Sequence, residues 1–401
     1  MAVATPAERE RLNALFAELC AIPSPFGRER AVADRVAAEL RDIGVAVEED
    51  GAAAEVGADA GNLLARVGGG APAPGAPAPG APAPGAPAPS APAAEARRGV
   101  LLCAHLDTVP HGDFPIEPVV VDDGWENANA AILGADNKAA VAVILVAARR
   151  AAGEGRALEL LFTVSEENAL AGAKAFDAQR LRSRFGYVLD HASPIGEIVV
   201  ASPTYYRVTA EFHGKAAHAG IRPEDGRSAI VAAARAIKEL QLGRLDPQTT
   251  ANVGTIEGGA GGTNVVPERC RFLAEVRSLD PRRAESVVRE MVDRIQDAAN
   301  DPACDVDVDV DVERLFDGYR HADDAPQVLA AERALARTGH TPARIVTGGG
   351  SDANALETQG FPCTNLANGT ERNHEPTERV SIAALEDMLD VTLALIEETA
   401  A

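Results

Sequence analysis

Acidic and imidazole side chains stand directly after three apolar stretches of this 401-residue sequence. LLCAHLD brings His105 and Asp107, ILGAD brings Asp136, and FTVSEE ends in Glu166 and Glu167. Neutral imidazole and carboxylate are the ligand mixture of catalytic zinc-type centres, which keep one coordination position for water. The candidate metal ligands, two of which come from later segments, are His105, Asp136, Glu167, Asp190 and His374. This pattern indicates a metal-dependent hydrolase.

Five ligands suffice for two ions if one carboxylate is shared. Two metal ions about 3.5–4 Å apart need a bridging carboxylate, and Asp136, in a loop after a glycine, suits that position. Asp107 lies two residues beyond His105 and orients its imidazole if the chain turns back. Glu166 is then the general base, which takes a proton from the attacking water and later protonates the leaving amine.

The elements that must position these residues alternate between strands and helices. The expected strands span 100–105, 158–163 and 187–190, and the expected helices span 138–151 and 170–182. Such alternation is typical of an α/β layer with a mainly parallel sheet, in which ligands collect at the carboxyl ends of the strands. An isolated HLD or EE pair in an acidic protein is usually surface decoration. Here all the pieces follow apolar strands, which favours one shared site.

The segment 200–313 follows a different pattern, β-α-β-β-α-β, which is typical of a ferredoxin-like α+β fold. Asp280 and Pro281 form an N-cap and first-turn pair, and the helix after them carries one apolar stripe. We therefore predict an inserted second domain at 200–313. The catalytic domain then consists of residues 1–199 and 314–401.

Two repetitive segments carry no predicted chemistry. The Pro/Ala-rich repeat at 69–98 cannot bury a core, so we predict a flexible insertion biased toward polyproline II. The alternating DVDVDVDV at 305–312 places its aspartates on one face of a strand. A solvated strand explains this better than a calcium site does.

Composition limits the classes of function. The formal charge of −22 opposes binding to nucleic acid or to an anionic membrane surface. The five cysteines are scattered and show neither CxxC nor a secretory framework, which favours free thiols in a reducing compartment. The first residues lack a signal-peptide pattern, and no apolar run is long enough to cross a bilayer. We therefore expect a cytoplasmic enzyme.

The motifs together resemble the di-zinc exopeptidase family that includes peptidase T, aminoacylase and glutamate carboxypeptidase, and its peptidase T-like branch most of all. They occur in the order HLDTVP, GADNKAAVAVIL, SEEN, VLDHA, HGKAAHAG, GGTNVVPERCRFLAEVRSLD, GGGSDAN and NHEP. The resemblance implies two zinc ions per subunit, for which cobalt or manganese can substitute. It assigns His105 and Asp190 to one ion, Glu167 and His374 to the other, and Asp136 to both.

The resemblance also assigns residues outside the metal centre. Asp107 and Glu166 match the two catalytic acids. His218 matches a lid-domain histidine that reaches across a dimer interface to the oxyanion, which implies a homodimer formed through the lid. Asn264 and Arg277 match residues that hold the substrate's backbone or carboxylate. The plainer alternatives are a loop histidine at 218 and an ordinary lid ion pair at 277.

The sequence thus predicts a zinc-dependent exopeptidase of the tripeptide aminopeptidase kind, acting on short peptides. One alternative is an amidohydrolase of the same family that acts on N-acyl amino acids or ureides. A second is an inactive metal- or peptide-binding protein, which both catalytic acids argue against. A third is a scaffold organised by the Pro/Ala segment. The GGGSDAN loop either presents backbone amides to substrate or is a tight turn capped by Ser351 or Asp352.

Overall fold

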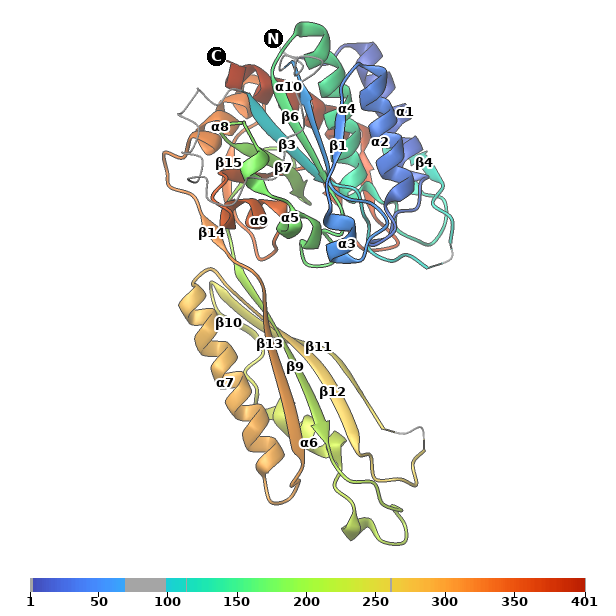
Figure 1. The fold of residues 1–401 in the computed structure, drawn as a ribbon, viewed down its shortest axis with the longest axis vertical. Coiled ribbons are helices and arrows are strands. Elements are labelled where there is room, and N and C mark those ends of the chain that lie inside the picture. Colours follow the sequence, from blue (N-terminus) through green and yellow to red (C-terminus); the bar gives the residue numbers. More distant parts are fainter. Residues whose placement is uncertain (1–2, 69–98, 113, 260–261, 401) are drawn as a thin grey trace, which may run out of the picture. The chain divides into compact units, whose positions relative to one another are not determined.

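The computed structural model describes residues 3–68, 99–112, 114–259 and 262–400. Within them the chain divides into two compact units (Figure 1). The first contains residues up to 200 with 321–345 and 351 onward, and the second contains 201–320 with 346–350. The second unit therefore extends beyond the expected limit at 313 and includes a short later segment. The predicted Pro/Ala-rich insertion lies outside the described residues.

The first unit is built on a mixed β-sheet with a parallel centre. Its strands, in sheet order, are β1 (Val47–Glu49), β2 (Leu63–Val67), β6 (Leu158–Thr163), β3 (Val100–His105), β7 (Gly186–His191), β16 (Cys363–Ala367) and β8 (Glu197–Ser202). The strands β6, β3, β7 and β16 run parallel, whereas β1, β2 and β8 join antiparallel. Every residue of β3 and β6 is buried, as expected for parallel strands covered on both faces.

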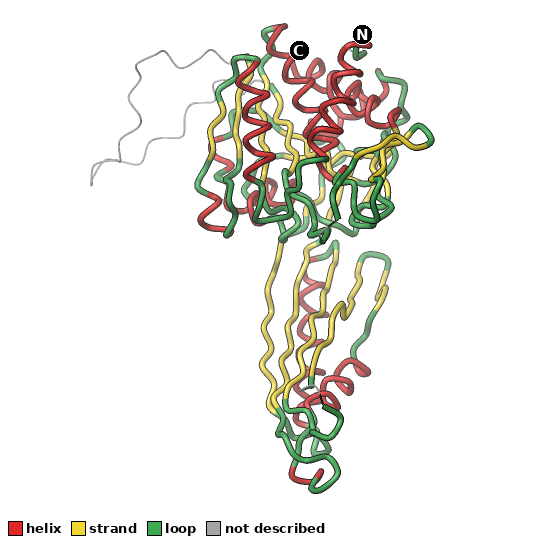
Figure 2. The backbone as a smooth tube through the Cα atoms, turned by 90° about the vertical axis from the view of Figure 1, so that its right-hand side faces the viewer, coloured by secondary structure: helices red, strands yellow, loops and turns green. Residues whose placement is uncertain are grey.

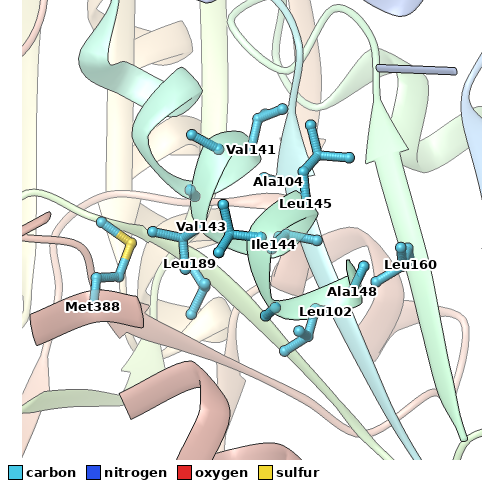
Figure 3. Close-up of a cluster of buried hydrophobic side chains, with 14 of the residues drawn as sticks. Leu102, Ala104, Val141, Val143, Ile144, Leu145, Ala148, Leu160, Leu189 and Met388 are labelled. Carbon is cyan, nitrogen blue, oxygen red and sulfur yellow. The ribbon is translucent and has the colours of Figure 1, made fainter. Parts of the chain in front are cut away.

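Helix α4 (Ala135–Glu154) forms the main contact with one face of this sheet. Figure 3 shows its side chains beside Leu102 and Ala104 of β3 and Met388 of α10 (Ile382–Ala400). The neighbouring Cys103 faces Asp352 of α9 (Asp352–Thr358) instead. Because successive residues of a strand point to opposite faces, α4 and α9 cover opposite faces of the sheet.

The remaining helices of this unit surround the sheet. They are α1 (Pro6–Cys20), α2 (Arg30–Asp42), α3 (Ala52–Val56), α5 (Ala171–Ala175) and α8 (Pro326–Arg337). A small antiparallel sheet of β17 (Thr370–Glu371), β18 (Arg379–Ser381), β5 (Gly124–Asn127) and β4 (Pro118–Val121) lies beside them. The strand β15 (Ala343–Val346) pairs with β8.

One expected helix is shorter than predicted. The helix expected at 170–182 is α5 followed by a separate 3₁₀ turn, Ala178–Arg180. The chain leaves the helical conformation at Phe176, with φ −70° and ψ 134°. Asp177 then caps the 3₁₀ turn, because its side chain accepts a hydrogen bond from the backbone N–H of Gln179.

The second unit has the predicted ferredoxin-like arrangement. Its strands pair antiparallel in the order β10 (Gly243–Asp246), β11 (Thr249–Gly258), β12 (Arg269–Ser278), β9 (Thr204–His213) and β13 (Asp307–Phe316). Figure 2 shows them as one layer beside α6 (Ala229–Glu239) and α7 (Pro281–Asn300), which contact each other and the sheet. The short β14 (Tyr319–Arg320) pairs with the end of β8. The predicted fold class is confirmed.

The predicted Asp280 cap and the predicted exposed face of the Asp/Val strand are observed in this unit, and a second cap is present. Ser228 caps α6 and Asp280 caps α7, each through a bond from a backbone N–H in the first turn. Along β13 the aspartates are exposed, as a solvated strand requires. Over the described residues, none of the helices has the length and apolar character to cross a membrane.

Candidate metal centre

The predicted acids and imidazoles of the first unit converge where its central strands end. His105 is the last residue of β3, Glu166 follows the end of β6 by three residues, and Asp190 is near the end of β7. Asp136 stands in the turn that begins α4, with φ −81° and ψ 104°. The sequence analysis expected a shared site at this edge of the sheet, because the carboxyl ends of parallel strands meet there.

Two groups of side chains lie close enough to hold a cation. In one, the ligand atoms of His105, Glu166 and Asp190 all lie within 4.8 Å of one another, and in the other those of His105, Asp136 and Glu167 do. Glu166, predicted as the general base, therefore also lies at ligand distance. The predicted His374 joins the second group, with its Nε2 2.9 Å from Glu167 Oε1.

Asp136 faces both histidines with different oxygens. Its Oδ1 lies 3.3 Å from His105 Nε2, and its Oδ2 lies 3.3 Å from His374 Nε2. His105 Nε2 also lies 3.5 Å from Asp190 Oδ1. A carboxylate with one oxygen directed to each side has the geometry that a bridging ligand needs.

Asp107 fastens the two glutamates as well as the histidine. Its fully buried carboxylate accepts the backbone N–H of Glu166 at Oδ1 and that of Glu167 at Oδ2, each at 3.0 Å. His105 Nδ1 lies 3.0 Å from the backbone carbonyl of Asp107 and 3.5 Å from its Oδ1. Asp107 thus lies behind the imidazole, as predicted, and also holds the turn that carries both glutamates.

Two further buried carboxylates, which sequence reasoning missed, hold the neighbouring turns. Glu378 accepts the backbone N–H groups of Leu133, Gly134 and Asp136. Glu29 accepts the N–H and hydroxyl of Ser165, each at 3.1 Å. Their partners lie more than a hundred residues away in the chain, so no local spacing marks them.

Burial and mutual repulsion dominate the electrostatics of the centre. Burial, and then the charge of Asp190, raises the pKa of Glu166 well above its ordinary value. Burial, and then the charge of Asp136, raises the pKa of Asp190 well above its ordinary value too. Burial lowers the pKa of His105, but the surrounding carboxylates outweigh it and raise that pKa well above its ordinary value. The site therefore favours bound positive charge.

The residues present fit divalent metal ions. Carboxylate oxygens and imidazole nitrogens are the donor set of zinc-type centres. Glu167 Oε1 is buried and accepts no hydrogen bond from the described residues, although His374 Nε2 lies 2.9 Å away. Buried oxygens are normally bonded, and a cation shared with the imidazole would satisfy this one.

The three predicted substrate-binding residues belong to the second unit and form two separate places. His218 and Asn264 lie on paired segments, because the backbone N–H of Ala219 bonds to the carbonyl of Asn264 at 2.9 Å. The Nδ1 of His218 accepts the N–H of Gly220 at 3.2 Å, so a neutral His218 carries its proton on Nε2.

Arg277 lies near the far end of β12, which starts five residues after Asn264. Its guanidinium pairs with Glu275 at 3.2 Å, donates to the carbonyl of Gly348 at 3.2 Å, and lies 4.0 Å from the centre of the Tyr205 ring. The lid ion pair considered as the plainer alternative is therefore present. All three contacts come from the second unit, to which Arg277 itself belongs, and together they orient its guanidinium.

The GGGSDAN segment forms a tight turn into α9. Ser351 is the N-cap residue, and the Asn354 side chain accepts its backbone N–H at 3.1 Å. A Cβ on Gly350 would stand 2.3 Å from the Phe316 ring, so only glycine fits there. The capped-turn alternative describes this segment.

Comparisons with known proteins point to peptidases. The model of the peptidase dimerisation domain matches residues 203–302, and that of peptidase family M28 matches residues 88–213. The uncharacterized protein YqjE of Bacillus subtilis is 34% identical over 98% of this chain and 99% of its own length.

Two solved structures are similar over almost the whole chain. Aminopeptidase PepT from Bacillus cereus is 35% identical, with a TM-score of 0.80 over 98% of this chain and 99% of its own. A tripeptidase from Staphylococcus aureus is 30% identical, with a TM-score of 0.84 over 98% of each chain.

Proposed function

Since this chain belongs to the peptidase T-like metallopeptidases, we propose that its acidic centre binds two zinc ions and removes the N-terminal residue from short peptides, tripeptides above all. The observation that carries this proposal is Asp136, whose two oxygens face two different histidines inside a buried ring of carboxylates. Such a ring serves a metallohydrolase, because its repulsions are relieved only by bound cations or protons.

The ligands divide into two sets around Asp136. In this proposal His105 and Asp190 hold one ion, Glu167 and His374 hold the other, and Asp136 bridges. When bound, the ions polarise the scissile carbonyl and lower the pKa of water. Zinc suits the mixed oxygen and nitrogen donors, and cobalt or manganese would be accepted by the same set.

Glu166 carries the proton in this mechanism. Its buried carboxylate removes a proton from the attacking water while the water oxygen bonds to the carbonyl carbon. It then delivers that proton to the amide nitrogen as the C–N bond breaks, so that one carboxylate serves as base and acid in turn. Asp107 keeps Glu166 in place through the backbone bond at 3.0 Å.

The second unit supplies the substrate contacts. We assign His218 to the developing oxyanion, since the residue is exposed and the bond from Gly220 to its Nδ1 leaves Nε2 to carry the proton. Asn264, on the paired segment, holds the peptide backbone. Arg277 is suited to a carboxylate by its planar fork of donors.

We also propose a homodimer formed by the second unit. On its surface Val231 of α6 is 56% exposed and Ile256 of β11 is 52% exposed. Among the described residues, β10 covers β11 only as far as Ala251, which leaves the outer edge from Asn252 to Gly258 without a strand partner. An exposed strand edge beside apolar side chains favours pairing with another chain.

The proposed location is the cytoplasm. All five cysteines are buried, free thiols, which suits a reducing compartment. The negative charge excludes neither peptides nor amino acids as substrates but opposes nucleic acid and anionic lipid as partners.

Substrate profiling tests the function. Zinc- or cobalt-loaded protein is offered tripeptides, dipeptides and N-acetyl amino acids, beside a Glu166→Gln control. We expect tripeptides to lose their N-terminal residue and the control to be inactive. Cleavage of N-acetyl amino acids alone would move the protein to the amidohydrolase alternative. Equal rates in the control would refute the assigned role of Glu166.

A further inference from the structure

Glu378 joins two loops of the metal centre without belonging to the proposed ligand set. It is 2% exposed and directly precedes β18. Its Oε2 accepts the backbone N–H groups of Leu133 and Gly134, and its Oε1 accepts that of Asp136, each at 2.8 Å. Both oxygens are therefore occupied by the turn that presents Asp136.

The turn before α4 needs an acceptor from elsewhere. Gly134 stands at the N-cap position with φ +75° and has no side chain to bond the first N–H groups. The start of a helix leaves such groups without intrahelical partners. Glu378 supplies the acceptor that a serine or aspartate cap would supply in another helix.

Glu378 also belongs to the segment that presents His374. The backbone N–H of Glu378 bonds to the carbonyl of Glu375 at 3.0 Å, and that of Glu375 bonds to the carbonyl of Arg372 at 3.1 Å. These bonds form two consecutive turns, with His374 in the first and Glu378 at the end of the second. The Glu378 carboxylate thus connects the turn of His374 to the turn of Asp136, whose side chains approach to 3.3 Å.

We propose that Glu378 is a positioning residue that sets the spacing between Asp136 and His374, and thereby the affinity for the ion these two residues hold with Glu167. The inference rests on the proposed two-metal function. Partners behind the ligands of a metal site typically contribute about 10–100-fold in metal affinity or activity. We place Glu378 in that class although it bonds to the ligand's backbone, because the backbone bond fixes where the side chain starts.

Glu378→Gln is the discriminating substitution. The amide keeps the size of the carboxylate but has one acceptor oxygen, so its NH₂ group must face at least one of the three N–H donors. The matched control is Glu159→Gln. Glu159 is buried and accepts the adjacent N–H groups of Arg182 and Ser183, but it lies at the beginning of β6, at the other end of that strand from the metal centre.

Metal binding is measured by titrating metal-free protein with zinc in competition with a chromophoric chelator, which resolves the two affinities. Amide hydrogen exchange of the peptide 132–137 is followed in the metal-free state. We expect Glu378→Gln to lower the affinity for one of the two ions about 10–100-fold and to leave the affinity for the other within a factor of about three. Amide hydrogen exchange at Gly134 and Asp136 should become faster. Glu159→Gln should keep both affinities.

Two results would overturn the inference. Unchanged affinities for both ions in Glu378→Gln, with wild type binding two, would refute the positioning role and leave the proposed function standing. Failure of the wild type to bind two ions would refute both. If Glu378→Gln does not fold, Glu378→Asp, which keeps both acceptors but is one methylene shorter, takes its place, and unchanged affinities for both ions would overturn the inference equally.

Discussion

Asp107 offers the sharpest single-residue test of how this site is organised. Its two oxygens each accept one backbone N–H, from Glu166 and Glu167, at 3.0 Å. Asp107→Asn preserves the shape of the side chain but leaves one acceptor oxygen. Whichever way the amide is oriented, its NH₂ group faces one of the two N–H donors. The turn then moves or keeps an unpaired donor in a fully buried place.

The expected magnitudes follow from these contacts. A hydrogen bond to a charged acceptor contributes about 1.5–3 kcal/mol, and Asp107→Asn loses one of them. A domain of ordinary stability, about 5–15 kcal/mol, survives that loss folded. Activity should suffer more, because displacement of a reacting group by about 1 Å costs on the order of 100-fold in rate. We expect kcat for a tripeptide to fall at least about 100-fold.

Urea unfolding of the metal-free protein measures the first quantity, and initial rates of the metal-loaded protein measure the second. Glu159→Gln is again the control, because it also removes a buried carboxylate, one that accepts two backbone N–H groups at Oε2 and pairs with Arg66 at Oε1. It should lose comparable stability and keep its kcat. If both variants lost the same small fraction of activity, Asp107 would be an ordinary structural acid, and the reasoning about the glutamate turn would be wrong.

Other predictions concern separate features. Glu166→Gln should lower kcat by about 100-fold or more with both metals retained, whereas loss of an ion on metal analysis would make Glu166 a ligand. Burial lowers the pKa of His321 from 6.5 to about 4, so the unfolded state takes up a proton before the folded state does as the pH falls. The free energy of unfolding, measured in urea, should therefore drop by about 1–2 kcal/mol between pH 7 and pH 5. His321→Gln should reduce this drop, and an unchanged drop in the variant would contradict the assignment to His321. Ile256→Glu with Val231→Glu should give monomers in sedimentation if the second unit forms the dimer, and persistent dimers would place the interface elsewhere. Deletion of 71–95 should leave kcat/KM unchanged, and a loss would show that the repeat contributes to activity.

The sequence predicted those parts of the fold whose side chains are determined locally. The strands β3 and β6 are mainly apolar and fully buried, and their limits agree with the predicted ranges 100–105 and 158–163. The hairpin β4–β5 escaped prediction because each strand has only four residues and nearly all of them are partly or fully exposed. The helix expected at 170–182 ends at Ala175, and Asp177 starts a separate 3₁₀ turn by a side-chain bond that the apolar spacing does not reveal.

The candidate site divides in the same way. His105, Glu166 and Asp190 stand at or just beyond the ends of parallel strands, so the alternation of strands and helices was enough to propose them as neighbours. Glu378 and Glu29 act at sites distant in the chain, on backbone N–H groups that carry no residue identity. A sequence holds no record of such a partner, because every residue type except proline would offer the same N–H at position 134 or 165.

These backing carboxylates also explain how the site remains negative. Asp107, Glu29 and Glu378 are each held by backbone N–H groups, which are dipoles without net charge. A lysine or arginine in the same place would neutralise an acid and compete with the metal for it. Uncharged donors fix a buried carboxylate without neutralising it, and its charge acts on the centre above its pKa, which burial raises to about 7 for Glu378. If this is the reason for the arrangement, Glu29→Gln should weaken metal binding through lost charge even where the turn at Ser165 stays in place, and a crystal structure beside a zinc titration would separate charge from position.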